Sequence, residues 1–561
     1  MTNVSESDCH PTVLADLADL RSDKIDRRTF LVRATALGLS AASACALAGV
    51  STQAAKADEN LPKPGGTLRI SMPVMPIVDP RLFDWPEMGN LARTFLEPLV
   101  RFTRQFTLEP HLLDRWEVDP TATQYTLHLR PGATWSNGDP FVAEDVIFNL
   151  GRWCEAHIPG NSMAQRMQSL VEQVSVADDG APVFGPRPGA LERLDDHTVR
   201  VTLNKPDVTF IPNLSDYPAL IVHRDFDTTG GNLLSQPLGT GPWVLEQMEP
   251  GQFFRAVRRP DAGGWWGDTV SGPVYLDAVE YHDLGTNPRD ELQAFTGGRI
   301  DANFETPAGF AQAFAEAGLQ RSDVLSGATI CVRMNTRQPP FDDVRVRRAL
   351  QSAVDNETIL DLGYDGMGLR AENHHVGPMN PDYAPLPPQI ADPSGAFEAL
   401  NAAGHGDTEF DLVSIDDDWR RNTCDAVAAQ LRDAGIKVRR TILGADAFWS
   451  DWKAFPFSGT NWTMRPLAVQ TYMLGYRSGA TWNETGFSDT RFDTLLDEAM
   501  GLSDIARRID VMAEMEQILQ SSGVIIQPYW RSLCRDMRTQ VRGLEIHPTF
   551  EDHLERVWID E

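Results

Sequence analysis

Apolar and polar residues follow two different periods along the chain, and together they predict a mixed α/β fold. Apolar residues alternate with polar ones at 125–129 and 198–203, which is the pattern of strands with one buried face. At 346–354 they recur at spacings of three and four, which indicates an amphipathic helix. Asp342 or Asp343 can cap the start of this helix, because both side chains accept hydrogen bonds from free N–H groups.

The second half of the chain shows strands and helices in alternation. We predict strands at 410–415, 436–443 and 524–527 and helices at 419–434, 491–500 and 503–522. The first two strands and the helix between them form a βαβ unit, which requires parallel pairing. We expect the aspartates at 416–418 to cap that helix, although ligands of open α/β sheets also bind at this end of a strand.

The first half of the chain predicts a strand at 66–71, helices at 91–99, 143–154 and 310–317, and a loop rich in proline and glycine at 180–189. The helix at 91–99 rests on Leu91, Phe95 and Leu99, which are spaced by four. Residues 100–212 show no chemistry of their own, and we expect them to serve as a scaffold.

Turn and aromatic motifs crowd the stretch from Pro237 to Asp301. In order, they are GTGPW at 239–243, RRP at 258–260, GGWWG at 263–267, PVYLD at 273–277 and AFTGGRID at 294–301. Gly239 and Gly241 suit a backbone geometry that is closed to residues with a Cβ atom, and Gly297 is expected to end a helix.

This ordered set resembles the signature of family 5 extracytoplasmic solute-binding proteins, the peptide, opine and nickel class that supplies ABC importers. The matches continue outside it, with GGTLRI at 65–70, GATWSNGDPF at 132–141 and DVRVRRAL at 343–350. The resemblance spans about 65–548. It implies an α/β fold in the form of a two-lobed periplasmic-binding-protein clamshell, with an extra inserted subdomain in lobe I and mixed sheets flanked by helices.

The resemblance and the order of the elements divide the chain into segments. We expect lobe I at 58–306 with its inserted subdomain at about 100–212, lobe II at 307–523, and a C-terminal return to lobe I at 524–561. The chain then crosses twice between the lobes, and two crossings make the hinge of a clamshell.

The N-terminal segment resembles a twin-arginine (Tat) export signal. Residues 26–31 carry paired arginines followed by Phe-Leu, the run at 34–50 is apolar and uncharged, and 55–57 offers small residues to a signal peptidase. The apolar run is shorter than the roughly 20 residues of a membrane span. The residues before Cys45 lack the large aliphatic side chain that a lipid-attachment site prefers. We therefore expect a Tat signal peptide at 1–57, cleaved on export to the periplasm.

Charge and motif content separate the function classes. The net charge of −29 over 561 residues argues against nucleic acid and anionic lipid headgroups as partners. The chain contains no GxSxG, HExxH or P-loop motif, and no GxGxxG turn that opens a helix after a strand. We therefore expect no catalytic residues, no metal site and no cofactor, which favours a binding protein over an enzyme.

The cysteine and histidine residues show no metal-ligand spacing. Four cysteines lie beyond the signal and could pair in an exported protein or stay as separate buried thiols: Cys154, Cys331, Cys424 and Cys534. His374 and His375 lie near Glu372, but adjacent side chains on a loop point apart, which favours a structural role over a metal site.

The segment from Asn461 to Phe487 is the candidate ligand site, and it begins with a strand and turn at 459–466. In the peptide-binding members of the family that the chain resembles, the matching turn carries an aspartate that holds a ligand ammonium. This chain has Arg465 there. A guanidinium pairs with a carboxylate through two hydrogen bonds, and leaving it unpaired in a closed cleft is costly. Arg465 therefore requires a ligand carboxylate or a resident one, such as that of Glu484.

Six residues of this segment are the candidates for substrate binding: Asn461, Trp462, Thr463, Arg465, Tyr472 and Trp482. Their aromatic rings could stack on a sugar or another planar ligand, although aromatic residues at this density are also typical of a core. We expect Trp449 and Trp452, which precede the segment, to belong to the core.

The resemblance implies that the chain is the substrate-binding component of an ABC importer. We expect it to capture a small polar solute in the periplasm, such as a peptide, an opine or another carboxylate-bearing molecule. The monomer would then contact the membrane permease transiently. Three alternatives stay open: an oligosaccharide or metal chelate as ligand, a periplasmic enzyme exported by the Tat route, and a ligand-sensing partner of a membrane receptor.

Overall fold

The computed structural model describes residues 11–22, 24–37, 39, 41–48, 61–260, 264–387 and 389–560. Within them, no helix combines the length and the apolar character that crossing a bilayer requires. The helices near the N-terminus, α1 (Pro11–Arg21), α2 (Arg27–Ala36) and α3 (Ala41–Leu47), pack on one another. The peptidase site expected at 55–57 lies outside the described residues, so the cleaved signal stays a prediction.

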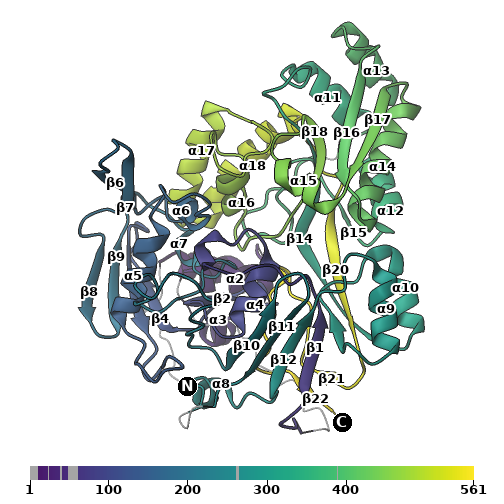
Figure 1. Cartoon of the computed structure of the whole chain (residues 1–561). Helices are drawn as coiled ribbons and strands as arrows, with labels where there is room; N and C mark the ends of the chain where they lie inside the picture. The colour runs from purple at the N-terminus through teal and green to yellow at the C-terminus, as the bar shows by residue number, and fades with distance from the viewer. Residues whose placement is uncertain are drawn as a thin grey trace.

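One mixed sheet of 12 strands runs through the whole molecule (Figure 1). In spatial order, ten of its strands are β10 (Trp243–Glu249), β11 (Phe253–Arg258), β12 (Ala278–His282), β1 (Thr67–Ser71), β13 (Ala302–Asn303), β20 (Tyr529–Met537), β14 (Gln320–Met334), β18 (Phe457–Trp462), β16 (Glu409–Ile415) and β17 (Lys437–Leu443). Two more strands lie off this path, β15 (Gly368–Arg370) beside β20 and β19 (Ile525–Ile526) beside β14. The pair β14 and β20 therefore joins the two halves of the sheet.

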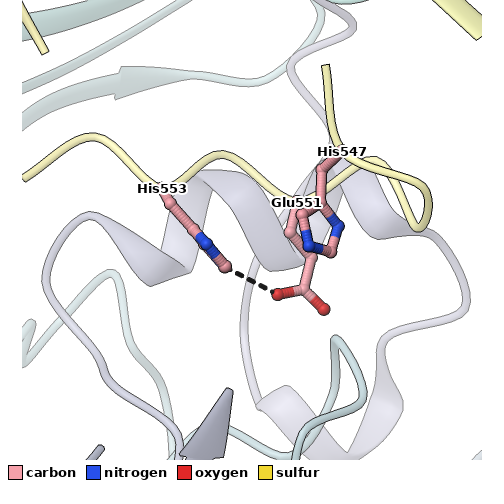
Figure 2. A group of neighbouring side chains, drawn as sticks. All are labelled: His547, Glu551 and His553. Carbon is pink, nitrogen blue, oxygen red and sulfur yellow. Dashed lines mark hydrogen bonds and ion pairs between the residues drawn. The ribbon is translucent and has the colours of Figure 1, made fainter. Parts of the chain in front are cut away.

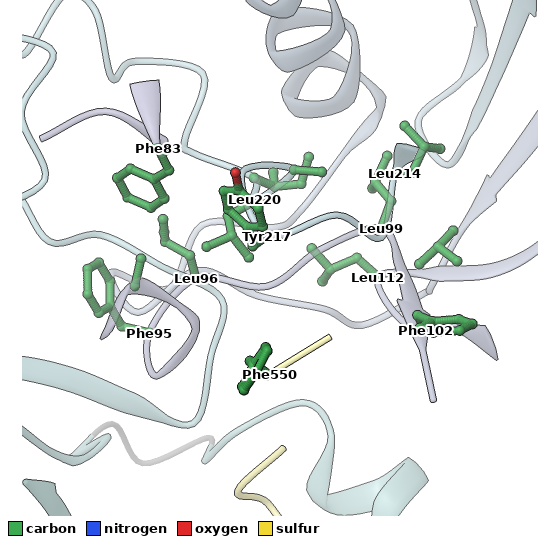
Figure 3. Close-up of a cluster of buried hydrophobic side chains, with 14 of the residues drawn as sticks. Phe83, Phe95, Leu96, Leu99, Phe102, Leu112, Leu214, Tyr217, Leu220 and Phe550 are labelled. Atoms are coloured by element: carbon green, nitrogen blue, oxygen red, sulfur yellow. The ribbon is translucent and has the colours of Figure 1, made fainter. Parts of the chain in front are cut away.

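The two halves of the sheet carry separate hydrophobic cores, which define two lobes. Part of the first-lobe core is shown in Figure 3, where Phe95, Tyr217 and Phe550 lie in one cluster. The second lobe has one core around Phe410 and another around Phe492. The chain is thus the expected two-lobed clamshell, whereas the residue numbers of the lobe boundaries stay a prediction.

Helices flank the sheet in both lobes. They are α4 (Pro86–Arg93), α5 (Ala143–Trp153), α6 (Met163–Arg166), α7 (Phe210–Asn213), α8 (Asp268–Ser271), α9 (Pro288–Thr296) and α10 (Ala311–Glu316), followed by α11 (Val344–Ser352), α12 (Asn356–Tyr364), α13 (Pro393–Ala402), α14 (Asp418–Asp433), α15 (Ala445–Asp451), α16 (Ala468–Gly475), α17 (Thr490–Gly501) and α18 (Ile505–Ser522). The predicted βαβ unit is confirmed, since β16 and β17 pair in parallel around α14. Asp343 caps α11 and Asp417 caps α14, as expected.

A smaller antiparallel sheet forms the inserted subdomain of the first lobe. Its strands are β4 (Leu113–Val118), β5 (Gln124–Leu129), β9 (Thr198–Thr202) and β8 (Leu191–Asp195). Two short ladders lie elsewhere, β2 (Val100–Phe102) with β3 (Leu108–Pro110) and β21 (Val541–Arg542) with β22 (Trp558–Ile559). The loop expected at 180–189 is wrong, because β7 (Pro182–Pro186) pairs there with β6 (Val171–Val176). Each of these two strands has a single neighbour, and such edge strands tolerate proline.

The helix expected at 91–99 is also wrong. The chain instead forms α4, which ends at Arg93, while Leu91, Phe95 and Leu99 are all buried in the first-lobe core. Pro98 disfavours helical geometry at the residue before it, so a helix cannot continue through this point. The spacing of four therefore identified buried positions but not the element that carries them.

The tryptophan motif of the stretch 237–301 meets a buried carboxylate. Glu97 accepts hydrogen bonds from Trp265 Nε1 at 3.1 Å and from Trp266 Nε1 at 2.8 Å, and its Oε1 lies 2.8 Å from His111 Nε2. Burial raises the pKa of Glu97 to about 7, although Arg101 and the tryptophan hydrogen bonds oppose the shift. The side chain of Glu97 thus links His111 to Trp265 and Trp266, which lie far from it in the sequence.

Gly239 and Gly241 are required by close packing and not by an unusual φ angle, because neither has a positive φ. A Cβ atom on Gly239 would lie 1.7 Å from Phe95 O, and one on Gly241 would lie 2.9 Å from Phe95 C. Gly241 N also donates a hydrogen bond to Phe95 O at 2.9 Å. The expectation of a special backbone geometry at these glycines is therefore corrected: the neighbouring backbone leaves no room for a side chain.

Replacing Gly239 with Ala should lower the free energy of unfolding by about 1–3 kcal/mol, because the new methyl group overlaps a backbone carbonyl. Urea unfolding followed by circular dichroism measures the change. Gly151→Ala is the control, since a Cβ atom there meets nothing within 4 Å and the residue lies within α5. An equal loss of stability in both variants would contradict the packing explanation.

Candidate functional site

A cavity of about 730 Å³ lies between the two lobes. The first lobe lines it with Asp84, Trp85, Tyr217 and residues between 156 and 171, and the second lobe with Trp449, Trp452, Lys453, Asn461, Trp462, Thr463, Arg465 and Trp482. The inserted subdomain, which we expected to be a scaffold, therefore also forms one wall of the cavity.

The structure brings five of the six candidate residues to this cavity: Asn461, Trp462, Thr463, Arg465 and Trp482. It does not bring Tyr472 there. Tyr472 lies in α16, is fully buried, and donates its hydroxyl hydrogen bond to His374 O at 2.9 Å. Contact of the five residues with a ligand stays a prediction.

Tryptophan rings cover much of the cavity wall. The ring centres of Trp85 and Trp449 lie 4.6 Å apart, so this pair joins the two lobes, and Trp462 lies 6.1 Å from Trp482. The expectation that Trp449 and Trp452 belong to the core holds only in part, because both are half-buried against a small core around Phe448 and both also line the cavity. Local aromatic density could not decide this point, since it is the same for a core and for a cavity wall.

Arg465 is 5% exposed and pairs with a carboxylate of the opposite lobe. Its Nε atom lies 3.0 Å from Asp216 Oδ2, and its Nη1 atom donates to Thr463 Oγ1 at 2.5 Å. Arg465 follows β18 in the second lobe, whereas Asp216 follows α7 in the first. The resident carboxylate beside Arg465 is therefore Asp216 and not Glu484. Arg465 Nη2 makes no hydrogen bond to a residue that the structure describes, and Nε, although 3.0 Å from Asp216 Oδ2, is not aligned to donate one there.

Asp216 also pairs with Arg166, a residue that is wholly buried. Asp216 Oδ2 lies 2.7 Å from both Nε and Nη2 of Arg166, and Asp216 Oδ1 accepts a hydrogen bond from Tyr217 N at 2.9 Å. Burial by itself raises the pKa of Asp216, but Arg166 and Arg465 outweigh it and hold that pKa below its ordinary value. The carboxylate is thus ionised, and the group carries two positive charges for one negative charge.

Glu484 belongs to a second buried network. It accepts hydrogen bonds from Arg333 Nε at 3.1 Å, Thr460 Oγ1 at 2.7 Å and Trp462 Nε1 at 2.8 Å. Burial raises the pKa of Glu484, while Arg333 opposes the shift. Because Trp462 is bonded to Glu484, this network fixes the orientation of a ring in the cavity wall.

Sequence reasoning missed Asp216 and Arg166. Both residues lie in segments without a motif, and no spacing relates them to Arg465. The one signal in the sequence was the requirement that a buried arginine have a carboxylate partner. That requirement predicts the type of partner but not its position.

His547, Glu551 and His553 are a candidate metal-ligand set, because one potential ligand atom of each lies within 4.8 Å of the others (Figure 2). His547 Nε2 donates to Phe102 O at 3.1 Å. Glu551 Oε2 lies 3.0 Å from His553 Nε2 and 3.4 Å from Arg93 Nη2. A resident guanidinium therefore already neutralises the carboxylate, and the contacts are those of a buried hydrogen-bond network.

His374 and His375 join different networks, as expected of adjacent side chains. His374 Nε2 lies 2.7 Å from Glu372 Oε2, and His375 Nδ1 shares a hydrogen bond of 2.8 Å with Tyr476 OH. Four cysteines beyond the predicted signal are free and buried: Cys154, Cys331, Cys424 and Cys534.

Comparison with known proteins gives a match to the model of the bacterial extracellular solute-binding proteins, family 5 Middle, over residues 107–484. Heme-binding protein A of Haemophilus influenzae is 26% identical over 464 residues, which cover 75% of this chain and 79% of that protein.

Two solved structures share the fold at low sequence identity. The oligopeptide-binding protein AppA from Bacillus subtilis, in complex with a nonapeptide, has a TM-score of 0.75 and 18% identity over 89% of this chain and 100% of that one. The binding protein AgaA from A. tumefaciens R10, in complex with agropinic acid, has a TM-score of 0.76 and 20% identity over 88% of this chain and 99% of that one. One fold therefore holds chemically different ligands, and the fold alone does not select among them.

Replacing Glu484 with Gln should lower the free energy of unfolding by about 3–5 kcal/mol, because the buried guanidinium of Arg333 is left without its counter-charge. Urea unfolding measures the loss. Glu514→Gln is the control, since its pair with Arg491 lies in solvent and should contribute no resolvable stability. A similar loss in both variants would show that burial does not govern these ion pairs.

Proposed function

The chain belongs to the bacterial extracellular solute-binding proteins of family 5, and we propose that it serves as the substrate-binding component of an ABC importer. In this role it captures a small polar solute outside the cytoplasm and delivers it to a membrane permease. The observation that carries the proposal is the cavity to which both lobes contribute side chains. A ligand that contacts both walls favours closure, because some of its contacts exist only in the closed state.

We propose that the ligand carries a carboxylate or a comparable anionic group. Arg465 lines the cavity, and its Nη2 atom makes no hydrogen bond to a described residue. The group of Arg166, Asp216 and Arg465 holds one positive charge in excess. A ligand carboxylate at this point gains a charge-assisted hydrogen bond, whereas a ligand ammonium meets a charge of its own sign.

The remainder of the ligand would lie against the tryptophan rings. Such rings offer flat apolar faces on which planar groups stack. The volume of the cavity falls in the range of about 300–1,000 Å³ that is typical of small-molecule sites. A peptide, an opine or another carboxylate-bearing molecule fits this description. The density of tryptophan also favours an oligosaccharide as the second candidate ligand.

We propose that binding involves no covalent step. A cysteine and a histidine do lie together, with Cys331 Sγ 3.7 Å from His375 Nδ1, but both are buried. Burial raises the pKa of the Cys331 thiol, which leaves it in the protonated form that is a poor nucleophile. His375 Nδ1 is already occupied by Tyr476 OH, so it is not free to act as a base.

We further propose that the chain reaches the periplasm by the Tat route, loses residues 1–57 and works as a monomer. The paired arginines at 27–28 and the extracellular placement of the family support this route. Mass spectrometry of the exported protein tests the cleavage, and a mature chain that retains residues 1–57 would contradict it.

A thermal-shift screen of the exported protein against small carboxylates, peptides and oligosaccharides should identify ligands that raise its melting temperature by mass action. For a carboxylate ligand found in this way, Arg465→Met should lower the affinity by about 1.5–3 kcal/mol, the contribution of a hydrogen bond to a charged group. Isothermal titration calorimetry measures the change.

Lys453→Met is the matched control, because Lys453 also lines the cavity but is exposed to solvent. It should leave the affinity nearly unchanged, since exposed charges are screened by water and salt. Equal affinity of the wild type and Arg465→Met for the carboxylate would refute the assigned role of Arg465.

A further inference from the structure

We infer that Asp216 is a positioning residue that sets the specificity of the cavity for a ligand with a single negative charge. It does so by sharing one carboxylate between Arg166 of its own lobe and Arg465 of the other. The same contact links the two lobes. The statement about the ligand rests on the proposed function, whereas the link between the lobes stands on geometry alone.

The shared atom is Asp216 Oδ2. It lies 2.7 Å from two nitrogen atoms of Arg166 and 3.0 Å from Arg465 Nε. The other carboxylate oxygen, Oδ1, is occupied by the N–H of Tyr217. All three charged side chains are at least nine-tenths buried. Water therefore screens these charges weakly. One carboxylate faces two guanidinium groups, so one positive charge is left without a counter-charge within the group.

The first lobe holds Asp216 and Arg166 in place before closure. Arg166 Nη1 donates to Ser162 O at 2.6 Å, and Arg166 O accepts a hydrogen bond from Asn213 Nδ2 at 2.8 Å. The ring of Tyr217, the residue after Asp216, lies in the first-lobe core (Figure 3). The hydroxyl of Tyr217 donates to Asp84 O at 2.8 Å. Half of the group is thus preorganised, and closure adds Arg465.

Further contacts cross the cleft beside this group. Gln470 Nε2 of the second lobe donates to Asn213 Oδ1 at 2.8 Å, and Gln165 Nε2 of the first lobe donates to Met473 O at 2.5 Å. The guanidinium of Arg166 lies 5.1 Å from the ring centre of Trp482. Lys205 and Asp497 also pair across the lobes, at 2.8 Å, but in solvent. Loss of Asp216 alone therefore removes the buried charge link and leaves the other contacts in place.

Two further carboxylates lie beside the group, those of Glu551 and Asp84. Glu551 shares a small hollow with Arg465, but Arg93 already pairs with it at 3.4 Å. Asp84 and Lys453 line the cavity with opposite signs. Burial raises the pKa of Asp84, while Arg166 and Lys453 oppose the shift, and Asp84 forms no ion pair with Arg166 or Arg465 within the described residues. One buried positive charge thus remains for the ligand.

A single ligand carboxylate neutralises this remaining positive charge. A neutral ligand leaves the charge without a partner. A ligand ammonium would add to the positive charge, and a second ligand anion would exceed it. Buried charges without partners are costly, so the group favours a monoanionic ligand over these three classes. Without Asp216 the site would hold two unpaired guanidiniums and would favour a dianionic ligand.

The link between the lobes is tested by replacing Asp216 with Ala in the full chain without ligand. Small-angle X-ray scattering in chloride buffer should show a larger radius of gyration than for the wild type, because Arg166 and Arg465 repel one another across the cleft. Acetate at the same ionic strength should restore the wild-type radius and raise the melting temperature, since its carboxylate replaces the missing one. A wild-type radius in chloride, or no effect of acetate, would overturn the inference.

Asp207→Ala is the matched control. Asp207 is a buried aspartate of the first lobe, and its side chain accepts a hydrogen bond from Thr209 N at 2.9 Å within that lobe. It should lose stability without opening and without a response to acetate. Asp216→Asn, which keeps the size of the side chain, covers the case in which Asp216→Ala does not fold. It should open in chloride buffer, and a radius equal to that of the wild type would count against the inference.

The specificity is tested with a monocarboxylate ligand from the screen and a dicarboxylate homologue. Calorimetry should show that Asp216→Asn shifts the ratio of affinities toward the dicarboxylate at least about tenfold, a change of 1.4 kcal/mol. An unchanged ratio would overturn the assignment of Asp216. Binding of only neutral solutes would refute the charge specificity but not the proposed importer function. Binding of no solute would count against the proposed function. In that case the scattering experiment still tests the link between the lobes.

Discussion

The pairing of β14 with β20 is the constraint on which the rest of the structure depends. β20 pairs on its other side with β13 of the first lobe, and β14 pairs with β18 of the second. The ladder between them is interrupted from Leu325 to Thr329, where the register shifts. Ladder hydrogen bonds resist separation of the strands, while an irregular register allows them to bend and twist. This pair of strands therefore holds the lobes together. Bending at its irregular segment is the motion that we expect to open and close the lobes.

Charge within the closed cleft is organised in pairs, and the pairs differ in where their partners come from. Arg333 and Glu484 both belong to the second lobe, so their pair does not depend on closure. Arg465 differs, because its partner Asp216 comes from the first lobe and is already shared with Arg166. Burial makes an unshared charge costly, and for this reason we propose that the charge of the ligand is selected at this point. The tryptophan rings line much of the same cavity.

Local sequence patterns predicted the elements correctly where several local signals agree. The caps Asp343 and Asp417 and the βαβ unit are of this kind, since period, cap and turn agree. The predictions failed at 91–99, where α4 ends at Arg93 and Pro98 disfavours any later helix, and at 180–189, where pairing with β6 makes a strand out of a segment rich in proline and glycine. At 91–99 the buried positions were predicted correctly, but proline geometry rules out a helix. At 180–189 the composition was described correctly, but pairing with β6 makes the segment a strand.

The sequence by itself determined the fold class, the family signature and the need of Arg465 for a carboxylate, because these follow from periodicity, turn chemistry and the cost of burying charge. Only the tertiary structure decided that the carboxylate is Asp216, that Trp449 lines the cavity and that Tyr472 does not. These facts depend on how two lobes meet. Contacts between residues far apart in the chain leave no spacing or period in the sequence from which they could be read.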